Sequence, residues 1–290
     1  MNTPHQSQGN GAPQPDETYP TPLEILLMIL AANFVGQFLA LLAGSSLREM
    51  FAESISLKIQ LLVFYVGFGG LPLLYFWRKG YDLPKIFRLR HSVPTRVLSL
   101  CAALGAALYF VVEYLARLLI HFIPRGEEHL KLVQSILQTD SLMAWLLLLV
   151  IMLVMEVLVS EGIFRGVLLS TLEQYSDVTR AVIVASVASV AVKFDSLASG
   201  DSIYLLVYAF LLTWLSWRAG SLLAPLATSF AFQLIGVIDT ALDFENTLPG
   251  YTWGELMSPL YLVVAIAVIY QAVIAIEGFY RSKAPSSSME

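Results

Sequence analysis

Long apolar runs dominate the chain and predict a bundle of membrane-spanning helices. A stretch of about 18 or more apolar residues is long enough to cross a bilayer as a helix. We identify eight such stretches, at residues 23–47, 56–77, 97–122, 142–160, 180–198, 203–217, 221–241 and 258–279. The sixth is the shortest and ends at Trp217 and Arg218. The pattern predicts an all-α, polytopic membrane protein with about eight transmembrane helices.

The fourth apolar stretch carries charged residues that a membrane span normally excludes. Glu156, Glu161 and Arg165 lie in it or just beyond it. Each ionisable group inside the hydrocarbon costs at least ~2.5–3.5 kcal/mol on insertion scales, so such groups usually face a bundle interior. In a helix, Ser160 shares a face with Glu156, and Arg165 follows Glu161 at the spacing of an ion pair. This polar face is the best candidate for a functional centre.

Composition and charge support the membrane assignment and predict its orientation. Hydrophobic residues make up 57% of the chain and charged residues 13%, which excludes an ordinary soluble domain. The most basic loop follows the second span and contains Arg78, Lys79, Lys85, Arg88, Arg90 and Arg96. By the positive-inside rule this loop is cytoplasmic, so eight spans place both termini in the cytoplasm. We expect a multi-pass plasma-membrane protein, and the net charge of −5 gives no sign of nucleic-acid binding.

Two features outside the fourth stretch have structural interpretations. In the third span Glu113 and Arg117 are four residues apart, which predicts an ion pair near the bundle interior. The linker that follows contains H-L-K-L-V-Q-S-I-L, which predicts a partly helical connection. The one cysteine, Cys101, allows no disulfide within the chain and is expected to be a small buried side chain.

Residues 160–168 read S-E-G-I-F-R-G-V-L, which resembles the first motif, E-E-x-x-F-R-G-x-L, of the CPBP family. This family comprises the CAAX proteases and the bacteriocin-processing enzymes, which are eight-helix intramembrane proteases. Residues 188–194 align with its second motif, F-x-x-x-H. Residues 220–233 read G-S-L-L-A-P-L-A-T-S-F-A-F-Q and resemble its third, G-S-L-x-x-P-I-x-x-H-x-x-x-N. The resemblance covers about residues 140–236 and implies a CAAX-protease-like helical bundle.

The resemblance divides the chain into four parts. Residues 1–20, rich in Pro, Gln, Asn and Gly, are expected to form a disordered cytoplasmic tail. Residues 21–136 hold the first helices and the basic loop, and residues 137–245 form the CAAX-protease-like core. Residues 246–290 contain the last transmembrane helix and a cytoplasmic tail.

The catalytic positions that the resemblance implies are substituted in this chain. In the family, the first Glu of motif one and the His of motif two are thought to activate water, and the His and Asn of motif three to hold the oxyanion. The residues at those positions here are Ser160, Phe194, Ser229 and Gln233. Glu161, Phe164, Arg165 and Gly166 match the family. We take Glu161 and Arg165 as retained motif residues, and Glu156 and Phe164 as candidate substrate contacts.

The residues also argue independently against hydrolysis and against a bound metal. None of the four histidines follows residue 129, so the polar centre of the C-terminal half has no imidazole as base or ligand. Glu156 and Glu161 are five residues apart and are expected to point roughly 140° away from each other around a regular helix. We therefore expect no zinc and no other cofactor.

Two other catalytic arrangements compete with this interpretation. Ser160 and Lys193 could form a Ser–Lys dyad, although Lys193 is expected at the outer end of its span beside Asp195. Glu156 could replace the missing first Glu from one helical turn away, but a displacement of ~5–6 Å exceeds the reach of a general base. We favour a neutral, hydrogen-bonded core of hydroxyl and amide groups at this position.

Three functions remain open at this point. The first is a non-catalytic homologue that binds a membrane-protein partner or a lipidated or hydrophobic peptide. The second is a divergent but active intramembrane endopeptidase that acts near a CAAX-like or hydrophobic C-terminus. The third is a small transporter or lipid-handling protein that uses Glu156, Glu161 and Arg165 as its polar path. In each case membrane lipids are the surroundings, and nucleic acid is not an expected partner.

Overall fold

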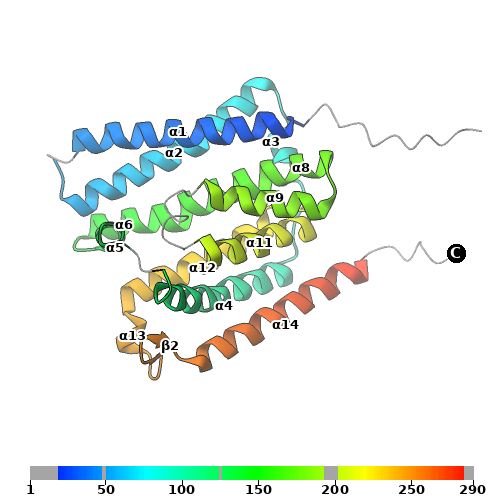
Figure 1. Cartoon of the computed structure of the whole chain (residues 1–290). Coiled ribbons are helices and arrows are strands. Elements are labelled where there is room, and N and C mark those ends of the chain that lie inside the picture. The colour runs from blue at the N-terminus through cyan, green and yellow to red at the C-terminus, as the bar shows by residue number, and fades with distance from the viewer. Residues whose placement is uncertain (1–18, 48–49, 124–125, 193–201, 284–290) are drawn as a thin grey trace, which may run out of the picture.

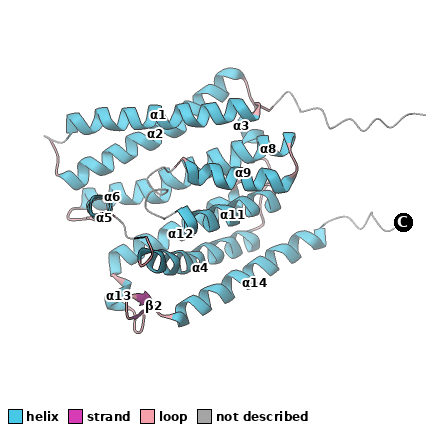
Figure 2. Ribbon diagram, viewed as in Figure 1, coloured by secondary structure: helices cyan, strands magenta, loops and turns pink. Residues whose placement is uncertain are grey.

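The computed structural model describes residues 19–47, 50–123, 126–192 and 202–283 (Figure 1). The described part is almost entirely helical, with one two-stranded hairpin (Figure 2). The first half contains α1 (Pro22–Leu47), α2 (Glu53–Lys79), α3 (Leu83–Ile86), α4 (Thr95–Ile120) and α5 (Glu127–Leu137). A long helix follows, made of α6 (Leu142–Leu149), η1 (Val150–Glu156), α7 (Val157–Glu161), η2 (Gly162–Leu168) and α8 (Leu169–Tyr175). The remaining elements are α9 (Val178–Ala191), α11 (Ser202–Ala219), α12 (Leu223–Leu242), α13 (Phe244–Thr247), β1 (Thr252–Trp253), β2 (Leu256–Met257) and α14 (Pro259–Lys283).

Among the described residues, seven helices are long and apolar enough to cross a membrane. They are α1, α2, α4, the long helix Leu142–Tyr175, α11, α12 and α14. This confirms the prediction of an all-α, polytopic membrane protein. The fifth predicted span, 180–198, corresponds to the shorter apolar helix α9, and the residues that follow it lie outside the described part. Most of the predicted tail, 1–20, also lies outside it.

The helices run roughly side by side, with the long helix α6–α8 inside the bundle (Figure 1). α1 packs against α2 on one side of it, while α4 packs against α12 and α14 on the other. α9 and α11 pack against each other and against η2. The start of α1 and the end of α14 lie at the same end of the bundle (Figure 1). The core thus surrounds the segment that the sequence singled out.

The fourth span is longer than predicted, because its helix continues from residue 160 to Tyr175. The added part is enclosed by protein, since every residue from Glu161 to Leu172 is buried. Two π-helical segments, η1 and η2, flank the short α-helical segment α7. Segments of π-helix are rare in proteins, and those that occur often lie at functional sites. Protein contacts rather than lipid therefore surround the charged half of this helix.

The basic loop is partly an internal element and not only a charged surface loop. Arg88 is buried and forms an ion pair with Glu173. Its Nη1 also donates a hydrogen bond to the Ser216 carbonyl at 3.0 Å. Ser170 Oγ donates to the Ile86 carbonyl at 2.9 Å. Burial lowers the pKa of the Arg88 guanidinium and Glu173 opposes that effect, but a guanidinium stays charged at any neutral pH. The loop thus fastens α8 to α11.

Phe87 in this loop explains the glycine of the F-R-G sequence. A Cβ at Gly166 would lie 3.2 Å from Phe87 Cδ1, and one at Gly162 would lie 3.3 Å from Phe87 Cε1. Both distances are tighter than ordinary van der Waals contact. Gly162 and Gly166 therefore allow the loop to pack closely on η2.

At the opposite end of the bundle, an aromatic cluster supports the α12–α14 connection. Phe110 stacks on Phe244 and Tyr261, with ring centroids 6.3 Å apart in each case. Arg117 pairs with Glu113 at 2.7 Å, as the sequence predicted, and also with Glu245 at 2.5 Å. The predicted helical linker is α5, which follows α4 at this end.

The close packing of α4 on α12 gives a direct test of the fold. A Cβ at Gly105 would lie 2.0 Å from the Thr228 carbonyl oxygen, whereas a Cβ at Gly70 would meet nothing within 4 Å. We expect Gly105→Ala to lower the free energy of unfolding by ~1–3 kcal/mol through overpacking. Gly70→Ala should leave it unchanged or raise it slightly, because alanine favours helices. Thermal unfolding of the detergent-solubilised variants measures both effects. Equal unfolding temperatures for the two variants would contradict the α4–α12 contact.

Candidate functional site

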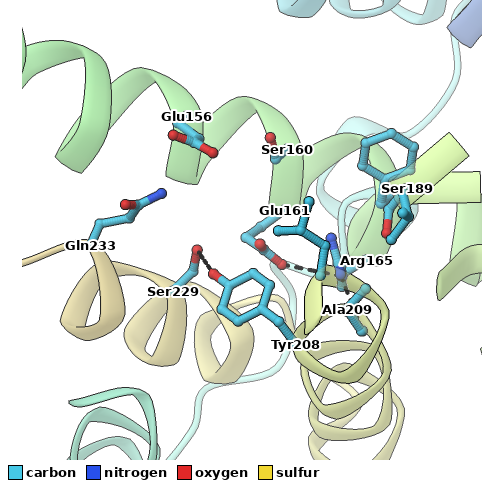
Figure 3. Close-up of a pocket in the computed structure, with 12 residues that line it drawn as sticks. Glu156, Ser160, Glu161, Arg165, Ser189, Tyr208, Ala209, Ser229 and Gln233 are labelled. Carbon is cyan, nitrogen blue, oxygen red and sulfur yellow. Dashed lines mark hydrogen bonds and ion pairs between the residues drawn. The ribbon is translucent and has the colours of Figure 1, made fainter. Parts of the chain in front are cut away.

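A small polar cavity lies where α6–α8, α9, α11 and α12 meet (Figure 3). Its volume is about 30 Å³. That space holds roughly two water molecules. It is lined by Glu156, Ser160, Glu161, Phe164, Arg165, Ser189, Val190, Leu205, Tyr208, Ala209, Ser229 and Gln233. Seven of the eight candidate residues from the sequence are in this set, so the structure brings them together.

The buried ion pair between Glu161 and Arg165 forms one side of the cavity. Arg165 Nε lies 3.4 Å from Glu161 Oε2, and the two side chains are only 3% and 2% exposed. Arg165 Nη2 also donates a hydrogen bond to the Ala209 carbonyl at 3.1 Å. Ser216 Oγ donates to the Arg165 carbonyl at 3.0 Å. The guanidinium compensates the carboxylate, as the four-residue spacing predicted, and it also links η2 to α11.

A pair of hydroxyl groups faces this ion pair from the other side. The Tyr208 and Ser229 hydroxyl oxygens are 2.8 Å apart and share a hydrogen bond between α11 and α12 (Figure 3). Ser229 stands at the position that the resemblance assigns to a histidine. The sequence reasoning did not identify Tyr208, although a phenol within an apolar span is a recognisable signal, because a buried hydroxyl needs a partner.

Glu156, Ser160 and Gln233 form the remaining polar part of the cavity. Figure 3 shows Glu156 and Gln233 directed toward the same space from α6–α8 and α12. Glu156 and Glu161 were expected to point far apart, yet both line the cavity. The cavity covers a broad arc of the helix, which includes Ser160 between them, so side chains at its two edges reach it. The angle between Glu156 and Glu161 around the helix therefore does not place the two carboxylates in different environments.

The second motif is represented by the end of α9. Val190, at the position of the family's phenylalanine, lines the cavity. Ser189 lines it too, but its Oγ donates to the Ser186 carbonyl at 2.8 Å and is engaged within its own helix. Phe194 and Lys193 lie outside the described residues, so the geometry of the proposed Ser160–Lys193 dyad is not defined.

Phe164 is buried between the cavity and the α2 side of the bundle. Its ring centroid lies 6.4 Å from that of Phe68 in α2. Because it lines the cavity as well, it is both a packing residue and an apolar wall of the site. Its expected role as a substrate contact remains a prediction.

The donors around the cavity do not fit a zinc ion. Within the described ranges, no group of three or more His, Cys, Asp or Glu residues is arranged to hold a metal. Zinc sites are built from thiolates and imidazoles with carboxylates as supplementary ligands. Here the cavity offers two carboxylates, and one of them lies against the positive charge of Arg165. A cation at Glu161 would be repelled by that guanidinium.

Comparison with known proteins identifies the segment that contains this site. Residues 142–235 match a family model described as type II CAAX prenyl endopeptidase Rce1-like. No curated protein and no solved structure matches the chain. The matched segment begins at the start of α6 and ends within α12, so it contains every described residue of the cavity. The match agrees with the motif resemblance, and the chain is a CAAX-protease-like integral membrane protein whose Rce1-like segment spans residues 142–235.

Proposed function

We propose that this protein is a non-catalytic CAAX-protease-like membrane protein that binds a hydrophobic or lipidated peptide without cleaving it. One observation carries the proposal. At three positions that the family uses for bond-making, the cavity presents the hydroxyl groups of Ser160 and Ser229 and the amide of Gln233. Neutral hydroxyl and amide groups donate and accept hydrogen bonds, but they do not take up a proton near neutral pH. These groups favour binding over hydrolysis.

The remaining carboxylates do not replace the missing base. Glu161 is already engaged by Arg165, whose Nε lies 3.4 Å from Glu161 Oε2. Glu156 lines the same cavity, but it lies one helical turn before Ser160, so it does not stand at the position where the family carries its base. No imidazole follows residue 129 to take over this role. Together these features support a site without general-base chemistry.

The cavity is suited to polar groups of a peptide backbone. Ser160, Gln233 and the Tyr208–Ser229 pair provide both donors and acceptors at the edge of the apolar core. The cavity is too small to hold a peptide as it stands, so binding requires the surrounding helices to separate. Its two carboxylates outnumber its one guanidinium, which favours a neutral or amine-bearing group over a free carboxylate.

The orientation in the membrane forms part of the proposal. The basic loop between α2 and α4 lies at the end of the bundle where α1 begins and α14 ends. By the positive-inside rule, that end faces the cytoplasm. On this basis the proposal places both termini in the cytoplasm, and it includes a plasma-membrane location.

An active endopeptidase is the competing function, because the Tyr208 and Ser229 hydroxyls are potential donors to an oxyanion. We expect purified protein in liposomes to bind photoactivatable prenylated CAAX-like peptides and to release no product above background. Mass spectrometry of the peptides and of the crosslinked protein measures both outcomes. Turnover that disappears in Glu161→Ala would establish an endopeptidase and refute the proposal. A peptide that is neither bound nor cleaved would remove the binding role.

The Glu161–Arg165 pair should behave as a structural ion pair. We expect Glu161→Gln or Arg165→Met alone to lower the free energy of unfolding by ~3–5 kcal/mol, because each leaves one buried charge uncompensated. The double variant should recover most of that loss. The control is Arg180→Met, which breaks an exposed pair with Asp177 and should cost no more than ~1 kcal/mol. Unfolding curves in detergent distinguish these cases. Additive losses in the double variant would mean that the two residues act independently.

The charge of the cavity predicts a preference between peptide C-termini. We expect a peptide with an amidated C-terminus to bind about fivefold more tightly than the same peptide with a free carboxylate, a difference of ~1 kcal/mol. Glu156→Gln should reduce this ratio, because it removes one of the two negative charges. Glu255→Gln, which alters an exposed carboxylate at the far end of the bundle, is the control. Equal ratios in the wild type and Glu156→Gln would exclude Glu156 from the binding site.

A further inference from the structure

A second cavity, separate from the central one, lies between α4 and α14. Its volume is about 310 Å³, and it has no lining residue in common with the polar cavity. Its lining residues are Arg96, Val97 and Leu100 of α4 with Ala275, Gly278, Phe279 and Ser282 of α14. These residues come from the first turns of α4 and the last turns of α14. The cavity is therefore a groove at the end of the bundle that carries the basic loop.

The shape of the groove depends on small residues of α14. A Cβ at Gly278 would meet nothing within 4 Å, so open space lies directly over this glycine. Val97, Leu100 and Phe279 provide apolar walls around it. The volume falls at the lower end of the range found for small-molecule sites. An apolar chain can occupy this space without displacing a protein side chain.

The charge at the groove comes from Arg96. This side chain is exposed, and it forms no ion pair with any residue that the structure describes. The nearby acid on α14, Glu277, is already held by Arg218 at 2.6 Å and by Arg281 at 3.0 Å. The first turn of α4 contains no acidic residue. A permanent positive charge thus remains available at the groove.

Ser282 does not provide a second donor. Its Oγ donates a hydrogen bond to the Phe279 carbonyl at 2.9 Å, which leaves only lone pairs toward the groove. Recognition of an anion therefore rests on the planar guanidinium of Arg96, which suits two oxygens of a phosphate. A groove that combines an apolar floor with one unpaired guanidinium is complementary to an amphipathic anion.

We propose that this groove binds one anionic glycerophospholipid, with its phosphate at Arg96 and part of one acyl chain over Gly278. The position supports a lipid, because Arg96 and the last turn of α14 lie at the ends of two helices that are long and apolar enough to cross a membrane, where lipid headgroups are expected. Basic pockets between helices on the cytoplasmic side commonly hold anionic lipids. The site is independent of the central cavity and of the presence or absence of peptide binding there.

The test is native mass spectrometry of the full-length protein with equal amounts of phosphatidylglycerol and phosphatidylcholine that carry the same acyl chains. We expect the wild type to retain one phosphatidylglycerol in preference to phosphatidylcholine. Arg96→Gln should lower its retention about fivefold, the effect of one cation near a membrane surface. Arg96→Lys should give an intermediate retention, because it keeps the charge but loses the two-point contact with the phosphate. Gly278→Leu should reduce the retention of both lipids, because the new side chain fills the groove.

Two matched controls separate the groove from general effects. Arg78→Gln removes a cation at the same end of the bundle, from the last turn of α2, and should not change lipid retention. Gly70→Leu adds the same bulk at another glycine with open space around it and should also have no effect. Thermal unfolding of each variant verifies that the fold is intact.

Three results would overturn the proposal. The first is the same retention for Arg96→Gln as for Arg78→Gln, or for Gly278→Leu as for Gly70→Leu. The second is equal retention of phosphatidylcholine and phosphatidylglycerol by the wild type. The third is displacement of the lipid by soluble glycerol 3-phosphate at a similar concentration, which would show that the site takes a free phosphate and has no use for the acyl chain.

Discussion

The structure depends on the compensation of charge within one helix of the bundle. Glu161 and Arg165 are almost completely buried in a segment that would otherwise be apolar. An isolated charge in such surroundings is very costly, but a pair with a further hydrogen bond to the Ala209 carbonyl is tolerated. Because that carbonyl belongs to α11, the pair also fixes the position of α11 against η2. The four-helix arrangement around the cavity is built on this contact.

The same helix is also positioned from the loop side, by close packing and by a second ion pair. Gly162 and Gly166 leave space for Phe87, and Ser170 binds the Ile86 carbonyl. Arg88 then connects the loop to Glu173 and to Ser216. The F-R-G sequence is thus explained by two different demands, an arginine for the internal ion pair and a glycine for the approach of the loop. Both demands are structural, so this motif can persist where bond-making residues do not.

Around the ion pair, hydroxyl groups form hydrogen bonds that connect neighbouring helices. Tyr208 reaches Ser229 across two helices, and Ser216 reaches the backbone of Arg165. Such bonds stabilise contacts between membrane helices modestly and need no titratable group. The central cavity and the groove beside Arg96 differ in how their positive charges are compensated. The first has internal compensation for its cation, whereas the second presents a cation that no described acid compensates.

Sequence alone determined the membrane class, the number of long apolar helices to within one of the seven in the described residues, and most polar residues of the central face. These follow from local rules, because apolar length defines a span and a four-residue spacing defines a helical pair. Tertiary structure decided which helices enclose that face, that Tyr208 joins it, and that the fourth helix extends to Tyr175. It also showed that Arg88 is an internal tie and that Gly278 opens a groove. Each of these depends on contacts between residues far apart in the chain, and periodicity along one segment contains no information about such contacts.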